Sequence, residues 1–154
     1  MFDIITIGTA TKDIFLQSPL FKVIKDFQHL SEAKGFPTGE AECFALGSKI
    51  EVEKIIFARG GGATNTAITF ARQGLKTASL IKIAQDEAGE SIIKELKKER
   101  IKPLVVKDKN GITAHSVILL TPSGERTSLV YRGVSETLEE KEISWRKLSS
   151  RWVY

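Results

Sequence analysis

The chain has 154 residues, of which 42% are hydrophobic and 27% charged, and this composition is typical of one globular domain. No apolar run approaches the roughly 18 residues of a membrane-spanning helix. The first residues, "MFDIITIG", carry an acid and lack the basic start of a signal peptide. Cys43 is the only cysteine, which excludes an intrachain disulfide and favours a reducing compartment. We therefore expect a cytoplasmic protein that does not contact a membrane.

The net charge of +4 and the pI near 9.2 raise the alternative of a nucleic-acid-binding α/β domain. The basic residues gather in "KELKKERIK", residues 94–102, where they alternate with glutamates rather than aromatics. That arrangement is typical of a solvated helix surface. Nucleic-acid binding is therefore the less favoured alternative, and a steep salt dependence would be its signature.

The first third of the chain mixes strand signals with turn residues. Residues 3–8, "DIITIG", alternate in hydrophobicity and predict a buried strand. The proline and glycine residues within 15–39 predict an irregular segment there. Two further runs, "AECFAL" (41–46) and "KIEVEKIIF" (49–57), predict the strands of a hairpin that turns between them.

The middle of the chain alternates helix and strand patterns. The helices are predicted over residues 64–73 and 87–100, and the strands over residues 76–84 and 104–106. Such alternation indicates a parallel sheet with right-handed crossovers, and hence an α/β fold.

The last third returns to strands. "TAHSVILLT" (113–121) and "RTSLVYRG" (126–133) flank the turn "PSGE" and predict a second hairpin. Residues 138–148 have a helical pattern, and "RWVY" (151–154) begins another apolar run. We therefore expect a sheet that is incomplete at its carboxyl-terminal end.

Three consecutive glycines, Gly60 to Gly62, stand directly before the helix predicted over 64–73. Glycine permits close approach to the backbone, and the amino terminus of a helix offers unpaired N–H groups. The spacing matches neither the P-loop, nor the dinucleotide fingerprint, nor the protein-kinase glycine loop. The amide of Asn65 suits a polyhydroxylated ligand. Alternatively, Thr64 or Asn65 caps the helix and the glycines form a plain turn.

Other polar residues do not suggest a metal site. His29 and His115 have no partner at metal-ligand spacing, so both read as structural, and no metal-binding residue is predicted. Cys43 is expected to be a small buried hydrophobe. Asp86 and Glu87 stand at the start of a predicted helix and are expected to complement its amino terminus.

Taken in order, "DIITIGTATKD", "GGGATNTA", Gly74, "AQDEAGES" and "PSGERTSLVYRG" resemble the amino-terminal half of the ribokinase (PfkB-type) family of sugar and nucleoside kinases. The resemblance covers residues 1–154. It implies a three-layer αβα fold with a parallel central sheet and a small β-strand lid, whose strands lie near 41–57 and 112–133. The nucleotide-binding half of such a kinase is absent from this sequence.

The resemblance also implies a set of substrate-binding residues. Asp13 would bind substrate hydroxyls, Gly60 and Gly61 would present backbone N–H groups to the sugar, and Asn65 would contact further hydroxyls. Arg132 is the counterpart of an arginine that relatives use for acidic sugars. The lid strands would close over the substrate and exclude water.

Two departures from the family pattern bear on activity. Ala84 and Gln85 stand where the family has a glycine and often an acid, which leaves the acceptor open among ribose, a fructose phosphate, a keto-deoxy acid and a nucleoside. The Gly-Ala-Gly-Asp motif that carries the family's catalytic base does not occur in this sequence. No catalytic residue is therefore assigned to this chain, and ATP and Mg²⁺ are expected only for the complete enzyme.

The sequence thus predicts the substrate-binding half of an ATP-dependent carbohydrate kinase, inactive by itself. The alternative of another class is a non-catalytic remnant that binds a sugar or dimerises through the lid strands. A ligand-dependent rise in melting temperature would accompany sugar binding in either case.

Overall fold

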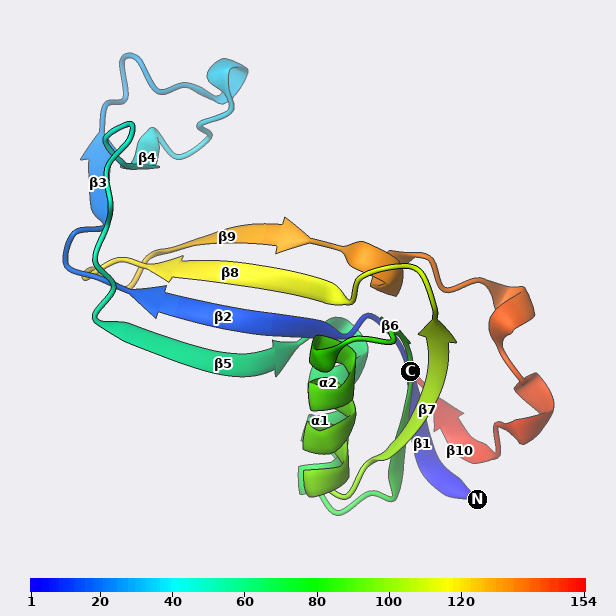
Figure 1. The fold of residues 1–154 in the computed structure, drawn as a ribbon. Coiled ribbons are helices and arrows are strands. Elements are labelled where there is room, and N and C mark those ends of the chain that lie inside the picture. Colours follow the sequence, from blue (N-terminus) through cyan, green and yellow to red (C-terminus); the bar gives the residue numbers. More distant parts are fainter. The chain divides into compact units, whose positions relative to one another are not determined.

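The computed structural model describes the backbone of residues 1–154 and every side chain except that of Lys147. The chain divides into two compact units, labelled by element in Figure 1. The first unit comprises residues 1–13, 57–116 and 130–154, and the second comprises residues 14–56 and 117–129. All five residues that the sequence predicts for substrate binding therefore belong to the first unit.

The first unit is built on a parallel sheet with the strand order β10-β1-β6-β7 (Figure 1). Its strands are β1 (Phe2–Gly8), β6 (Thr77–Ala84), β7 (Lys102–Asp108) and β10 (Ser150–Val153). Every residue of β6 is buried, because the strand has neighbours on both sides and cover on both faces. The parallel sheet predicted from the alternating pattern is confirmed.

Helices α1 (Gly62–Arg72) and α2 (Glu87–Lys98) pack on one face of this sheet. Ile92 and Leu96 of α2 join Ile81 and Ile83 of β6 in a fully buried core. Asp86 caps α2 by accepting a hydrogen bond from the Gly89 backbone N–H at 2.8 Å. The expected placement of Asp86 at a helix amino terminus is confirmed.

The opposite face of the sheet is covered by residues 133–148. Ile143 and Leu148 pack on a core of Ile5, Ala78 and Leu80. This covering segment holds three short 3₁₀ helices, η2 (Gly133–Glu136), η3 (Glu140–Glu142) and η4 (Trp145–Lys147). The single helix predicted over 138–148 is therefore wrong. Positions 143 and 148 are five residues apart, a spacing that does not fall on one helix face.

A buried lysine fastens this covering segment to the sheet. Lys82 of β6 ion-pairs with Glu142 at 2.8 Å and donates a hydrogen bond to the Thr137 carbonyl at 2.9 Å. The hydrogen bond from Lys82 holds the pKa of Glu142 below its usual range. Such tertiary bonds, rather than helix propensity, set the path of the segment.

A second four-stranded sheet has the order β5-β2-β8-β9. Its strands are β2 (Thr11–Gln17), β5 (Lys54–Gly60), β8 (Ala114–Leu120) and β9 (Arg126–Tyr131). Each strand has one end in the first unit and the other in the second. β8 and β9 are neighbours across a turn in which Gly124 has a φ of +89°, as the predicted second hairpin requires.

The second unit also contains the antiparallel pair β3 (Lys22–Lys25) and β4 (Glu40–Cys43), with the 3₁₀ helix η1 (Glu32–Lys34) between them. The hairpin predicted from 41–46 to 49–57 is wrong, because β4 pairs with β3 whereas β5 pairs with β2. Residues 15–39, expected to be irregular, contain β3 and the end of β2. Cys43 is exposed, not buried, since its two-stranded sheet leaves it open to solvent. Among the described residues, no helix is both long and apolar enough to cross a membrane.

Candidate functional site

Asp13 lies directly against Gly60, although 46 residues separate them in the sequence. The two belong to neighbouring strands, β2 and β5. A Cβ atom built on Gly60 would stand 2.1 Å from Asp13 Oδ2, so the space of a side chain at position 60 is occupied by the Asp13 carboxylate. A side chain at position 60 would therefore displace the Asp13 carboxylate.

The electrostatic setting of Asp13 is that of a partly desolvated acid. Burial raises the pKa of the Asp13 carboxyl, and a hydrogen bond with the Ser116 side chain offsets part of that rise. A carboxylate whose charge is incompletely solvated gains from added hydrogen-bond donors, such as the hydroxyl groups of a sugar.

Gly61 is required by the backbone itself. Its φ is +99°, and a Cβ on it would meet the Thr9 carbonyl oxygen at 2.4 Å and the Ala10 Cα at 2.8 Å. Gly62 has an ordinary φ, and the nearest atom to its Cβ position is Thr9 Oγ1 at 3.8 Å. The Cβ positions of Gly60 and Gly61 are thus occupied by neighbouring atoms, whereas that of Gly62 is not.

Thr9, which the sequence analysis does not single out, organises the start of α1. Its Oγ1 accepts a hydrogen bond from the Gly62 N–H at 3.0 Å, and its carbonyl accepts one from the Ala63 N–H at 3.2 Å. Gly61 occupies the N-cap position, so the alternative that Thr64 or Asn65 caps this helix is wrong. A threonine one residue beyond a buried strand, facing a glycine loop, is the signal that could have pointed to it.

Ser135 binds the backbone of Ala10, the residue after Thr9. Its hydroxyl accepts a hydrogen bond from the Ala10 N–H at 2.8 Å and donates one to the Ala10 carbonyl at 2.9 Å. Both groups are buried. The loop at residues 9–10 is therefore fixed between the glycines and η2, which gives Asp13, three residues further on, a rigid base.

The remaining two predicted residues lie around this arrangement. Asn65 is exposed in the first turn of α1. Arg132 is exposed at the start of η2 and ion-pairs with Glu136 at 2.8 Å. It lines a small cavity of about 60 Å³ whose wall also includes Thr9 and Ser135. The structure thus brings Asp13, Gly60 and Gly61 together and places Arg132 at a cavity that Thr9 shares.

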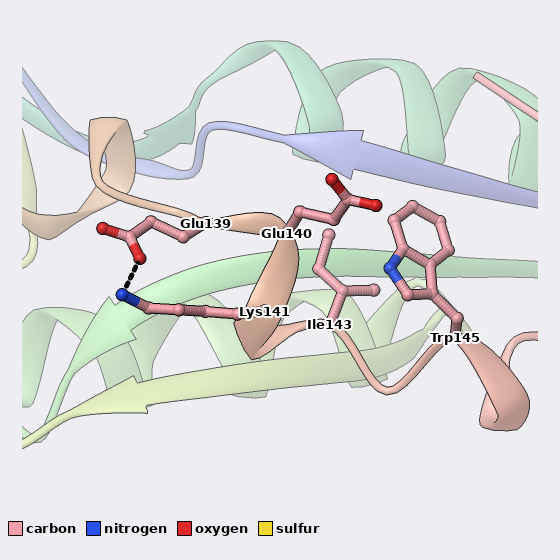
Figure 2. Close-up of a pocket in the computed structure, with 5 residues that line it drawn as sticks. All are labelled: Glu139, Glu140, Lys141, Ile143 and Trp145. Carbon is pink, nitrogen blue, oxygen red and sulfur yellow. Dashed lines mark ion pairs between the residues drawn. The ribbon is translucent and has the colours of Figure 1, made fainter.

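A different hollow is shown in Figure 2. It has a volume of about 630 Å³ and is lined by residues of the covering segment: Glu139, Glu140, Lys141, Ile143 and Trp145. The dashed line joins the ion pair between Lys141 and Glu139. Both side chains are mostly exposed, and none of the residues predicted for substrate binding lines this hollow. We assign it no role.

Acidic side chains elsewhere in the first unit are engaged in structural hydrogen bonds. In the described part of the chain, no group of three His, Cys, Asp or Glu side chains could hold a metal ion. The carboxylates of Asp86 and Asp108 accept hydrogen bonds from nearby backbone N–H groups. No catalytic step through Mg²⁺ or a nucleotide is therefore assigned to these residues.

The parallel sheet, the glycine loop at the start of α1 and the small antiparallel pair define a ribokinase-like α/β fold. Solved structures with this fold include ribokinase from Thermotoga maritima (18% identity, TM-score 0.69, covering 97% of this chain and 42% of that one). Adenosine kinase from Sinorhizobium meliloti also matches, with 22% identity and a TM-score of 0.65, covering 93% of this chain and 43% of that one. Ribokinase from Cryptococcus neoformans in complex with ADP matches with 18% identity and a TM-score of 0.61, covering 86% of this chain and 35% of that one.

The profile of the pfkB family of carbohydrate kinases matches residues 36–151. The chain therefore belongs to the pfkB carbohydrate kinase family. It spans about two fifths of the length of the solved structures it matches. The resemblance read from the sequence is confirmed at the level of family and fold.

Proposed function

We propose that this chain is the substrate-binding part of an ATP-dependent carbohydrate kinase and that it holds the sugar whose hydroxyl group receives the phosphoryl group. The observation that carries the proposal is the contact of Asp13 with Gly60 within a chain of the pfkB family. A half-buried carboxylate beside backbone N–H groups provides both an acceptor and donors for hydroxyl groups.

Each residue has a distinct role in the proposal. Asp13 accepts hydrogen bonds from sugar hydroxyls, and the N–H groups of Gly60 and Gly61 donate to sugar oxygens. Asn65 contacts further hydroxyls from the first turn of α1. Arg132 would exchange its ion pair with Glu136 for a carboxylate or phosphate on the sugar, which is supported by its exposure at the small cavity.

The chain's own contribution to the reaction is to orient the acceptor. Phosphoryl transfer depends on positioning and charge stabilisation more than on covalent help from the protein. ATP, with Mg²⁺, would supply the phosphoryl group in the complete enzyme. The ADP bound by the Cryptococcus neoformans ribokinase supports a nucleotide donor.

Ligand binding by the purified 154-residue chain tests the proposal. We would measure thermal shifts and isothermal titration with D-ribose, fructose 6-phosphate, a keto-deoxy sugar acid and adenosine. At least one is expected to raise the melting temperature and to bind weakly, while ATP and Mg²⁺ yield no phosphorylated product. Binding of none of the four, or robust ATP-dependent phosphorylation by this chain alone, would contradict the proposal.

Homodimerisation through the lid strands stays a prediction. It is supported by exposed apolar side chains on the two edge strands of the second sheet, Ile55 on β5 and Leu129 on β9. Light scattering after size-exclusion chromatography would reveal it, and a species of 17.0 kDa, the mass of one chain, would exclude it.

A further inference from the structure

Two basic residues stand directly before the two residues that form the core of the site: Lys12 precedes Asp13, and Arg59 precedes Gly60. Successive side chains of a strand point to opposite faces. Lys12 and Arg59 accordingly leave their strands on the face opposite Asp13 and reach α2. There Lys12 Nζ lies 3.4 Å from Glu95 Oε1, and Arg59 Nη1 lies 3.5 Å from Glu95 Oε2.

Glu95 is the carboxylate that contacts both cations. Its neighbour Glu99 lies 3.8 Å from Arg59 but is already paired with Arg72 at 2.6 Å. Lys12 is further held by the Ser91 hydroxyl of α2 at 2.8 Å. Helix α2 thus binds both Lys12, the residue before Asp13, and Arg59, the residue before Gly60.

The contacts of Glu95 with Lys12 and Arg59 are partly shielded from water. The side chains of Lys12 and Arg59 are only 16% and 20% exposed, and that of Glu95 is 31% exposed. The Arg59 Nε is buried without a hydrogen-bond partner among the described residues, so the nearby carboxylates supply its compensating charge. Partial burial limits screening by salt.

The place of the contact along the chain gives it a consequence for the site. β2 passes from the first unit to the second directly after Asp13, and β5 enters the first unit at Phe57. Glu95 therefore adds to each strand a contact that does not belong to the ladder between them. We propose that Glu95 is a positioning residue that keeps Asp13 and Gly60 in their sugar-binding arrangement by holding Lys12 and Arg59. The link to sugar rests on the proposed function; the link to the strands does not.

Hydrogen exchange in the purified chain tests the structural part without any ligand. In Glu95→Gln, exchange in peptides covering residues 9–14 and 57–62 is expected to rise about fivefold, the effect of losing roughly 1 kcal/mol of ion pairing. The matched control is Glu90→Gln, on the same helix, whose partner Lys107 lies 2.6 Å away and outside the site. It should leave both peptides unchanged. Unaltered exchange in Glu95→Gln, or an equal rise throughout the chain, would overturn the proposal.

Sugar affinity tests the positioning part. For whichever of D-ribose, fructose 6-phosphate, keto-deoxy acid or adenosine binds best, Glu95→Gln should weaken affinity about fivefold, and Glu90→Gln should not. Faster exchange with unchanged affinity would overturn the positioning role. If the wild-type chain binds none of these compounds, the proposed function fails, and the exchange result still decides whether Glu95 holds the strands.

A second set of variants distinguishes loss of the Glu95 ion pairs from a general loss of stability. In a chain carrying Lys12→Met and Arg59→Met, both partners of Glu95 are gone, so adding Glu95→Gln should have no further effect on exchange or affinity. Arg59→Lys keeps one charge and should restore part of the protection lost in Arg59→Met. A full additional effect of Glu95→Gln in the double background would show that Glu95 acts by another route.

Discussion

Replacing Asp13 by asparagine is expected to lower sugar affinity by about 10- to 100-fold, because a charged acceptor is lost from the proposed hydroxyl-binding site. The same change is expected to stabilise the unliganded chain. Asparagine has the shape of aspartate and can still bond with the Ser116 side chain, but it avoids the cost of desolvating a carboxylate. Gain of stability together with loss of binding is a mark of a functional residue.

The pH dependence follows from the raised pKa of Asp13. Because the pKa of this carboxyl is higher in the folded than in the unfolded chain, its contribution to stability is fully present below the unfolded pKa. That contribution is lost as the pH rises through the folded pKa. The stability advantage of Asp13→Asn over wild type should therefore grow with increasing pH over this window. Wild-type sugar affinity should fall as acid protonates Asp13, whereas the affinity of the variant should stay flat.

Urea denaturation and isothermal titration between acid and neutral pH measure these two effects. Glu87→Gln serves as the control, since it also removes one negative charge but from an exposed position of the first unit. An Asp13→Asn protein that binds sugar as wild type does would remove Asp13 from the site. One that is less stable than wild type at neutral pH would contradict the electrostatic argument.

Replacing Gly61 by alanine is expected to destabilise the chain by about 3 kcal/mol or more. The alanine would be forced to a φ of +99°, and its Cβ would collide with backbone atoms of Thr9 and Ala10 that cannot rotate away. Those two residues are held in turn by Ser135 and by the start of α1. The loop and the helix would have to separate, and this movement would displace the residues proposed to bind sugar.

Gly62→Ala is the matched control for this prediction. Its Cβ would make an ordinary contact with Thr9, and it opens a helix, where alanine is favoured over glycine. Its stability in urea should stay within about 1 kcal/mol of wild type, on the stabilising side. Equal losses in the two variants would mean that the glycines serve only local chain flexibility.

The elements that sequence patterns predicted well are those whose own residues carry the packing information. The apolar run of β6 and the amphipathic pattern of α2 both reappear in the structure with the expected buried side chains. The capping of α2 by Asp86 was likewise expected from the position of this residue in the sequence. These features depend on neighbours a few residues away, so a local pattern is sufficient to find them.

The elements that were predicted wrongly depend on distant partners. β4 has no local sign that it pairs with β3 rather than with the strand that follows it. The segment at 138–148 has enough helical character to suggest a helix, yet its path is set by Lys82 and by the sheet face it covers. In both cases tertiary contacts outweigh local propensity.

By itself, the sequence determined the family, the alternation of helices and strands that makes a parallel sheet, and the position of a glycine loop before a helix. The family resemblance singled out Gly60 and Gly61, but it gave no physical reason for setting them apart from Gly62. Only the tertiary structure showed that Asp13 fills the space of a Cβ on Gly60, that Thr9 and Ala10 fill that on Gly61, and that neither crowds that on Gly62. The physical reason is steric: what a glycine is needed for is decided by the atoms that occupy the place of its missing side chain, and those atoms come from elsewhere in the chain.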